Sequence, residues 1–223
     1  MIEIYKGSKE WEVAQKGEMK FWAHALDILP LSSELEKVER NYAAERANAC
    51  FTVHGEPYAF YIEAKTCLEV GSGPYPFLLA WTNAKKRIAI DPLFSYYSKF
   101  TTLKANEKHN GVFFFDGKAE DFEYKKERAF DIIICSNSID HCDEPNKVRD
   151  MMMRNLAQGG RIYIDLYLRA PASEAVHPHG WETPEAFCNW FNESKTLKFE
   201  YIRIVENASD KSDDRLFTRV EHA

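Results

Sequence analysis

Two glycines and one aspartate are spaced as they are in nucleoside-binding sites. Gly71 and Gly73 follow the apolar run CLEV (67–70), and they would let the backbone approach a ligand closely. Asp91 ends the next apolar run, 18 positions past Gly73, where a carboxylate could accept hydrogen bonds from both hydroxyls of a ribose. The pair fits NAD or another nucleoside cofactor.

The residues that follow Gly73 disfavour NAD. The NAD fingerprint, GxGxxG, places a pyrophosphate on the amide groups of a helix N-terminus. Here the run reads GSGPYP (71–76), so Pro74 removes one amide donor and no third glycine follows. An NAD-type oxidoreductase therefore stays an alternative rather than the leading hypothesis.

Histidines further along the chain are the candidates for acid–base chemistry. His141 ends the stretch SNSIDH (136–141), where it would act as a base or a substrate contact, or else pack as an ordinary loop residue. His177 and His179 lie in EAVHPHGWETPEAF (174–187) and are candidates for substrate contact. With Asp165 they could also ligate a metal, but a loop that Thr183 ends as a helix cap explains the stretch equally well, and we expect no metal.

Alternating strands and helices must position these residues. Apolar runs of strand length occur at residues 66–70, 87–91, 111–115, 130–136 and 161–168. Helical stretches are expected between them, at residues 92–104, 119–128 and 143–157. This alternation predicts an α/β fold whose parallel sheet is covered on both sides, with ligands at the carboxyl ends of the strands.

The two ends of the chain depart from this alternation. Residues 197–207 and 214–222 read as two strands without a helix between them, so they should pair as an antiparallel hairpin. Residues 9–28 and 32–50 have helical spacing instead. We expect an N-terminal helical cap or lid at residues 1–64 and the sheet domain at residues 65–223. Trp22 would then help to choose the substrate, or else pack as extra core on the sheet edge.

The composition is that of an ordinary globular protein, with 45% hydrophobic and 29% charged residues. The formal net charge of -6 argues against a nucleic-acid partner, which normally meets a basic patch. No apolar run is long enough to predict a membrane span. The five cysteines are odd in number and scattered, which favours reduced thiols in a cytoplasmic protein.

Five stretches resemble, in order, the motifs of class I S-adenosylmethionine-dependent methyltransferases. They are LEVGSGPYP, IAIDPL, GKAEDF, FDIIICSNSIDHCDEP and NLAQGGRIYI, and the resemblance covers roughly residues 65–222. It is strongest to the small-molecule branch. It implies a Rossmann-like three-layer αβα sandwich with a mostly parallel seven-stranded sheet and a C-terminal antiparallel hairpin. It also implies the cofactor S-adenosyl-L-methionine and the product S-adenosyl-L-homocysteine.

The resemblance implies a role for the residues of each motif. Those expected under the methionine part of the cofactor are Glu69, Gly71, Ser72, Gly73 and Pro74. Those expected around the ribose and the adenine are Asp91, Pro92, Leu93, Ala119 and Glu120. Lys118 stands where the family often has an aspartate, which leaves the contact to the adenine amino group open. Asn137 and Ser138 would border the reactive end of the cofactor, with His141 as the catalytic residue.

We therefore expect a methyltransferase that acts on a small-molecule or saccharide acceptor, with O-methylation favoured. The methyl donor is already a sulfonium cation, so the protein mainly has to align donor and acceptor. A non-catalytic binding protein that kept the methyltransferase fold is the second alternative.

Overall fold

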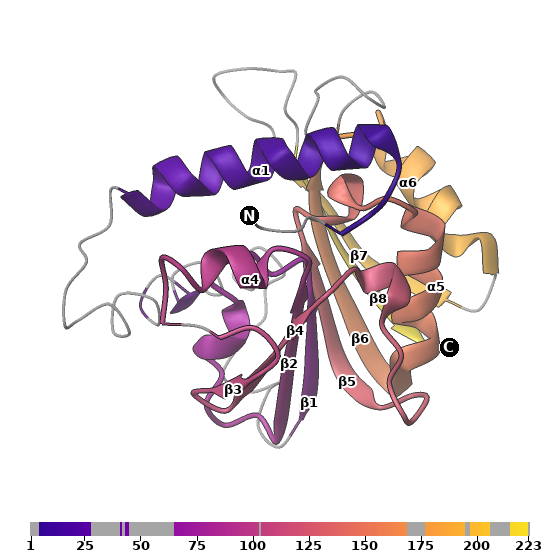
Figure 1. Cartoon of the computed structure of the whole chain (residues 1–223). Helices are drawn as coiled ribbons and strands as arrows, with labels where there is room; N and C mark the ends of the chain where they lie inside the picture. The colour runs from indigo at the N-terminus through magenta and orange to yellow at the C-terminus, as the bar shows by residue number, and fades with distance from the viewer. Residues whose placement is uncertain are drawn as a thin grey trace.

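The computed structural model describes residues 5–27, 41, 43, 44, 65–102, 104–168, 177–194, 197–205 and 215–222. Within these residues the chain forms one eight-stranded sheet in the order β3-β4-β2-β1-β5-β6-β8-β7 (Figure 1). The strands are β1 Thr66–Val70, β2 Lys86–Asp91, β3 Lys108–His109, β4 Val112–Asp116, β5 Phe130–Ser136, β6 Leu156–Tyr167, β7 Leu197–Val205 and β8 Arg215–His222. The α-helices are α1 Lys9–Asp27, α4 Phe94–Tyr97, α5 Pro145–Asn155 and α6 Pro184–Phe191.

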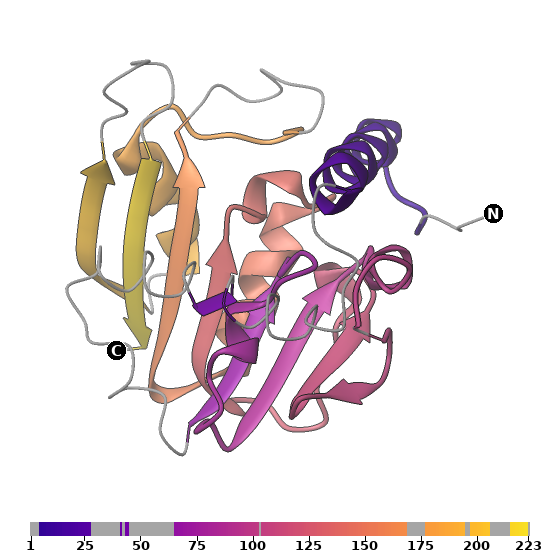
Figure 2. The same cartoon turned by 90° about the vertical axis from the view of Figure 1, so that its left-hand side faces the viewer.

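The sheet is parallel in its centre and antiparallel at its two edges. Strands β4, β2, β1, β5 and β6 pair in parallel, whereas β8 pairs antiparallel with both β6 and β7. Figure 2 shows this hairpin as one edge of the sheet. The predicted Rossmann-like sheet with a closing hairpin is thus confirmed. The two-residue strand β3, antiparallel to β4, is an addition that its polar sequence did not indicate.

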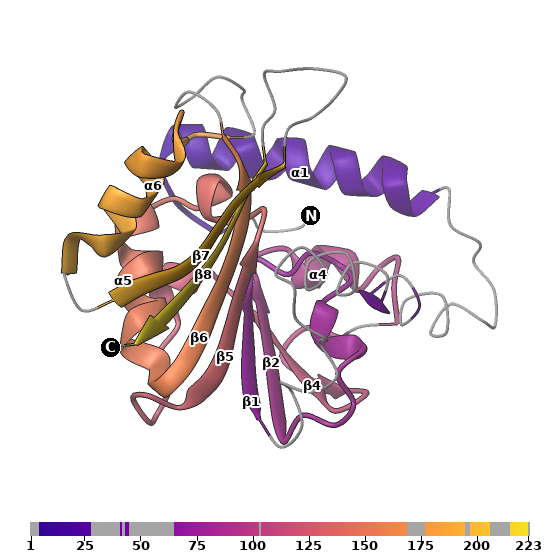
Figure 3. The same ribbon diagram turned by 180° about the vertical axis from the view of Figure 1, so that it is seen from behind.

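Apolar cores lie on both faces of the sheet. On one face, side chains of α5 and α6 such as Met152 and Phe187 pack against the strands. On the other face, Trp81, Phe94 and Tyr97 cover β1, β2 and β4. Figures 1 and 3 show the sheet between these two layers. The central strand β5 is buried from Ile132 to Ser136, which explains its continuous apolar sequence.

Helix α1 crosses the top of the sheet, at the end where the cofactor motifs were expected (Figure 1). Its start is capped by Ser8, whose hydroxyl accepts a hydrogen bond from the Trp11 amide at 3.2 Å. The predicted helix at residues 9–28 is confirmed by its bounds. The expected helix at residues 32–50 falls outside the described residues apart from positions 41, 43 and 44, which are helical.

Several expected helices are shorter than the sequence indicated. The stretch 92–104 holds only the four-residue helix α4, and the stretch 119–128 holds only a 3-10 turn, η2 (Ala119–Asp121). The chain after Gly73 forms another 3-10 turn, η1 (Phe77–Leu79), because Pro74 and Pro76 withhold amides that an α-helix would need. By contrast, α6 begins as predicted, with the Thr183 hydroxyl accepting from the Ala186 amide.

Strand β6 begins earlier than predicted. It starts at Leu156 rather than at residue 161, so Gly159 and Gly160 lie inside the strand instead of in a turn before it. The pairing of β5 with β6 shifts register between Phe130 and Ile132, opposite this segment. Gly159 has a φ of 69°, a conformation that favours glycine. A glycine at this place in the sequence fits a turn as well as an irregular strand, so the sequence alone does not distinguish the two.

Candidate cofactor and acceptor site

A cavity of about 410 Å³ lies between α1 and the carboxyl ends of β1, β2 and β5. Ligands bind at this edge in open parallel sheets because the loops that leave neighbouring strands diverge there. All the predicted site residues line the cavity except Glu69, Pro74 and His179. Helix α1 supplies the opposite wall through Trp11, Gln15, Glu18, Phe21 and Trp22.

The loop after β1 has a backbone that only glycine adopts readily. Gly71 and Gly73 have φ values of 62° and 63°. A Cβ atom on Gly71 would lie 2.3 Å from the Cβ of Ser138, and one on Gly73 would lie 3.3 Å from the Cζ2 of Trp22. The Gly71 amide also donates to the carbonyl of Ile90 at 2.9 Å. The glycines therefore keep the loop close to β2, to the loop after β5 and to α1.

Asp91 joins the loops after β1 and β2. Its Oδ2 accepts from the Gly73 amide at 2.8 Å, and its Oδ1 accepts from the Leu93 amide at 2.8 Å. Burial raises the pKa of Asp91 to about 7, although these two amides lower it and the nearby Glu18 raises it further. Each carboxylate oxygen can accept a second hydrogen bond, so the group retains capacity for two donors from the cavity.

Two predicted cofactor residues use their carboxylates within the protein. Glu69 is buried below the cavity, and its oxygens accept from the amides of Phe77 and Leu78 at 3.0 and 3.1 Å. Glu120 lines the cavity, but its Oε1 accepts from the amides of Asp143 and Glu144 at 2.8 and 3.0 Å. Both carboxylates therefore satisfy the amides of loops that shape the site.

Lys118 fastens the start of α1 to the loop after β5. Its Nζ lies 2.7 Å from the Asp143 Oδ2 and 4.8 Å from the centre of the Trp11 ring. Asp143 also accepts from the Ser8 amide at 3.0 Å. Burial lowers the pKa of Lys118, but the hydrogen bond to Asp143 and the surrounding acids outweigh it, so the pKa is raised and the group stays charged. Lys118, which stands where the family often has an aspartate, is thus a structural contact of α1.

Four side chains form an acid–imidazole cluster, which we define as Glu18, Asp140, His141 and His177. The Nδ1 of His177 lies 2.7 Å from the Oδ2 of Asp140, and the rings of His141 and His177 are 4.1 Å apart between centroids. Glu18 comes from α1, with its Oε1 3.2 Å from the Nδ1 of His141. Burial would raise the pKa of Asp140, but the two histidines lower it. Glu18, His141 and His177 are far apart in the sequence, and folding brings their side chains into contact.

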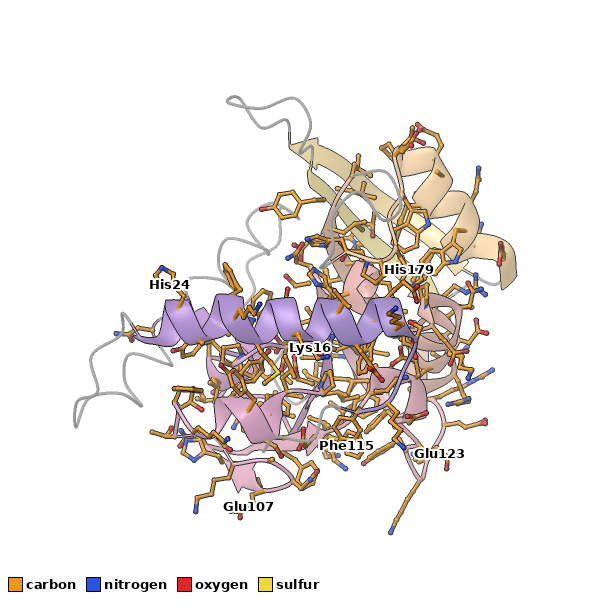
Figure 4. All side chains as sticks on the ribbon, turned by 45° about the horizontal axis from the view of Figure 1, so that its top comes forward. Lys16, His24, Glu107, Phe115, Glu123 and His179 are labelled. Carbon is orange, nitrogen blue, oxygen red and sulfur yellow. The ribbon has the colours of Figure 1, made fainter. Side chains whose placement is uncertain are left out.

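His179 lies outside this cluster. Its Nε2 is 3.2 Å from the backbone carbonyl of Asp143, and its amide donates to the carbonyl of Asp140 at 3.3 Å. Figure 4 shows it beside the N-terminal end of α1. The two histidines of the HPH stretch therefore have different surroundings, and only His177 lines the cavity.

Two cavity residues present amide oxygens without a partner in the described part of the chain. They are Oε1 of Gln15 and Oδ1 of Asn137, both buried. The backbone of Asn137 is strained, with a φ of 47°. Its backbone N–H donates to the carbonyl of Asp165 at 2.7 Å, which holds the loop after β5 in place. Gln15 and Glu18 line the cavity but were not predicted as site residues from the sequence. Their only signal was their spacing with Trp11 and Trp22 along one face of α1.

The comparisons with known proteins agree with this geometry. The family model described as "Methyltransferase domain" matches residues 68–164. No curated protein matches the sequence. No helix among the described residues is long and apolar enough to span a membrane.

Solved structures share the fold at low sequence identity. An S-adenosylmethionine-dependent methyltransferase from Mesorhizobium loti matches with a TM-score of 0.61 and 12% identity, over 78% of this chain and 97% of that one. The Burkholderia thailandensis 1,6-didemethyltoxoflavin-N1-methyltransferase, solved with S-adenosylhomocysteine, matches with a TM-score of 0.62 and 12% identity, over 100% and 93%. The [4+2]-cyclase SpnF matches with a TM-score of 0.63 and 12% identity, over 100% and 99%.

The family match and the loop geometry favour S-adenosylmethionine over NAD, the other nucleoside cofactor that the sequence left open. The short loop with its prolines lacks the helix N-terminus on which NAD places its pyrophosphate. The cavity instead offers close backbone and a buried acid beneath α1, an arrangement that fits S-adenosylmethionine. Residues 68–164 match the methyltransferase domain model, and the fold is that of solved S-adenosylmethionine-dependent methyltransferases.

Proposed function

We propose that the chain transfers the methyl group of S-adenosylmethionine to a hydroxyl group of a small, sugar-like acceptor. The observation that carries the proposal is the single cavity that joins the glycine loop and Asp91 to the acid–imidazole cluster. One end of it has the groups that a nucleoside cofactor needs, and the other has groups that can take up a proton.

The described thiols of Cys67, Cys135, Cys142 and Cys188 are free, which supports a cytoplasmic location.

The proposed cofactor contacts follow the floor of the cavity. The methionine part would lie on the backbone of residues 71–73, and the ribose hydroxyls would donate to Asp91. The adenine would lie among Pro92, Leu93, Ala119 and Glu120, which line the same end. When bound there, the cofactor supplies a sulfonium-bound methyl group that needs no further activation.

The acceptor would enter beside the loop after β5. Asn137 and Ser138 border this end, and His141 lies next to them in the cavity. During transfer the acceptor oxygen bonds to the methyl carbon, the carbon–sulfur bond breaks, and the hydroxyl proton leaves. We propose that His141 is the catalytic residue that receives this proton, while the sulfur departs with both electrons of the broken bond as S-adenosylhomocysteine.

The lid helix supports a small acceptor. Trp11, Trp22 and Phe21 of α1 face the cavity from above, so a bound substrate must fit between this helix and the sheet. Phe21 is 61% exposed and thus stands at the opening. An extended macromolecule would have to displace α1, which Lys118, Asp143 and Ser8 hold. The net charge of -6 further disfavours nucleic acid.

Gly71→Ala should abolish tight binding of S-adenosylhomocysteine, because its Cβ would lie 2.3 Å from the Cβ of Ser138. Repacking of this kind should weaken binding at least about tenfold. Gly159→Ala is the matched control: it has a φ of 69° but nothing within 4 Å of the added Cβ. Calorimetric titration of both variants measures the difference. Equal affinities would show that the contact between the two loops does not matter for the cofactor.

Affinity for S-adenosylhomocysteine should rise with pH. With a pKa of about 7, Asp91 is largely protonated at pH 6, and it must lose that proton before it can accept from both ribose hydroxyls. Between pH 8 and pH 6 the affinity should fall about tenfold. Asp91→Asn should bind weakly and lose this pH dependence. An unchanged slope in the variant would remove Asp91 from the ribose role.

His141→Asn should separate catalysis from cofactor binding. The wild-type protein is first incubated with S-adenosylmethionine and a panel of sugars, polyols, phenols and amines, and formation of S-adenosylhomocysteine is measured. With the best hydroxyl acceptor, His141→Asn should lower kcat by about 100-fold or more while it binds the cofactor product normally. His179→Asn, changed outside the cavity, should keep full activity.

Two outcomes would contradict this proposal. Full activity of His141→Asn would exclude His141 as the base. Cofactor binding without turnover on any acceptor would favour a binding protein, or other chemistry on the same fold, as the cyclase SpnF shows to be feasible.

A further inference from the structure

We propose that Asp140, His141 and His177 form a binding site for a divalent transition-metal ion at the acceptor end of the cavity. Each residue offers one ligand atom, and these atoms lie within 4.8 Å of one another. Two imidazoles and one carboxylate are a donor set typical of Zn²⁺, Fe²⁺, Co²⁺ and related ions. The inference stands on this geometry and does not depend on the identity of the acceptor.

Asp140 is the residue that most needs a further partner. Its side chain is completely buried. Its Oδ2 meets the Nδ1 of His177 at 2.7 Å, but its Oδ1 accepts no hydrogen bond from any other described residue. Oδ1 lies 3.8 Å from the Nε2 of His141, beyond hydrogen-bond distance. A buried carboxylate oxygen without a hydrogen-bond donor or a cation beside it lowers the stability of the folded protein.

The charges of the cluster also favour a cation. Two carboxylates lie beside the two imidazoles: Asp140 contacts His177, and Glu18 of α1 contacts His141. A divalent ion would offset both negative charges and draw the donors together, with each about 2 Å from the metal. Glu18 would then lie close enough to complete the coordination from α1, since its Oε1 is already 3.2 Å from His141.

The neighbouring groups narrow the kind of metal. Cys142 also lines the cavity, but its Sγ donates to the carbonyl of Ile139 at 2.8 Å, so the described ligands are nitrogen and oxygen. Mg²⁺ and Ca²⁺ prefer oxygen ligands alone and fit two imidazoles poorly. The base role proposed for His141 applies to the metal-free protein, because a nitrogen that binds a metal cannot also take up a proton. With the ion bound, the ion would lower the pKa of a coordinated acceptor hydroxyl.

Metal titration of the chelator-treated protein tests the inference without an acceptor. Zn²⁺ binding is followed by calorimetry, and Co²⁺ binding by its visible absorption bands, which report nitrogen and oxygen ligands. The wild-type chain should bind one ion. His177→Asn and Asp140→Asn should each weaken binding at least about tenfold. His179→Asn, from the same loop but directed to the Asp143 carbonyl, should bind as the wild type does.

The folding of each variant is checked by its thermal transition and by its affinity for S-adenosylhomocysteine. If Asp140→Asn does not fold, the comparison rests on His177→Asn. His177 lines the cavity, so its replacement should disturb the core less. No metal binding to the folded wild-type protein would overturn the inference. The inference would also be overturned if His179→Asn weakened metal binding as much as His177→Asn does. Because cofactor affinity is measured separately, either failure leaves the proposed methyl transfer to be judged on its own test.

Discussion

The structure of the site depends on the buried carboxylate of Asp91. Its two oxygens hold the amides of Gly73 and Leu93, so the loops after β1 and β2 are fixed to one another. A backbone turn that brings Gly73 this close requires a left-handed conformation, and the space beside Gly71 is already filled by Ser138. The floor of the cavity is therefore set before a ligand arrives, which lowers the ordering cost of binding.

The second half of the site comes from α1, far away in the sequence. This helix is attached near its start through Ser8 and Lys118, which share Asp143, and further along through Glu18, which reaches His141. The Tyr96 hydroxyl also donates to the carbonyl of Met19 at 2.9 Å. The helix thus covers the end of the cavity at Asp91 and contributes a carboxylate to the end at the acid–imidazole cluster. Its placement, rather than any one motif, turns an open sheet edge into an enclosed cavity.

The sequence predicted the sheet well because its signals are local. A continuous apolar run such as Phe130–Ser136 suits only a strand buried on both faces, and Thr183 followed by Pro184 marks a helix start. The helices expected at residues 92–104 and 119–128 were overestimated, since the chain there forms only the short helix α4 and the 3-10 turn η2. The carboxylates of Glu69 and Glu120 also accept hydrogen bonds from loop amides, and only the folded backbone shows these contacts. The role of Glu18 in the cluster could not be predicted, since its partner there, His141, lies more than a hundred positions away.

The most direct test of this account is a calorimetric titration of the unaltered protein with S-adenosylhomocysteine, followed by the same titration with NADH. The cavity below α1 should bind one molecule of S-adenosylhomocysteine per chain, with a dissociation constant in the micromolar range, and NADH should not displace it. No heat of binding at high micromolar S-adenosylhomocysteine, or its displacement by NADH, would contradict the account.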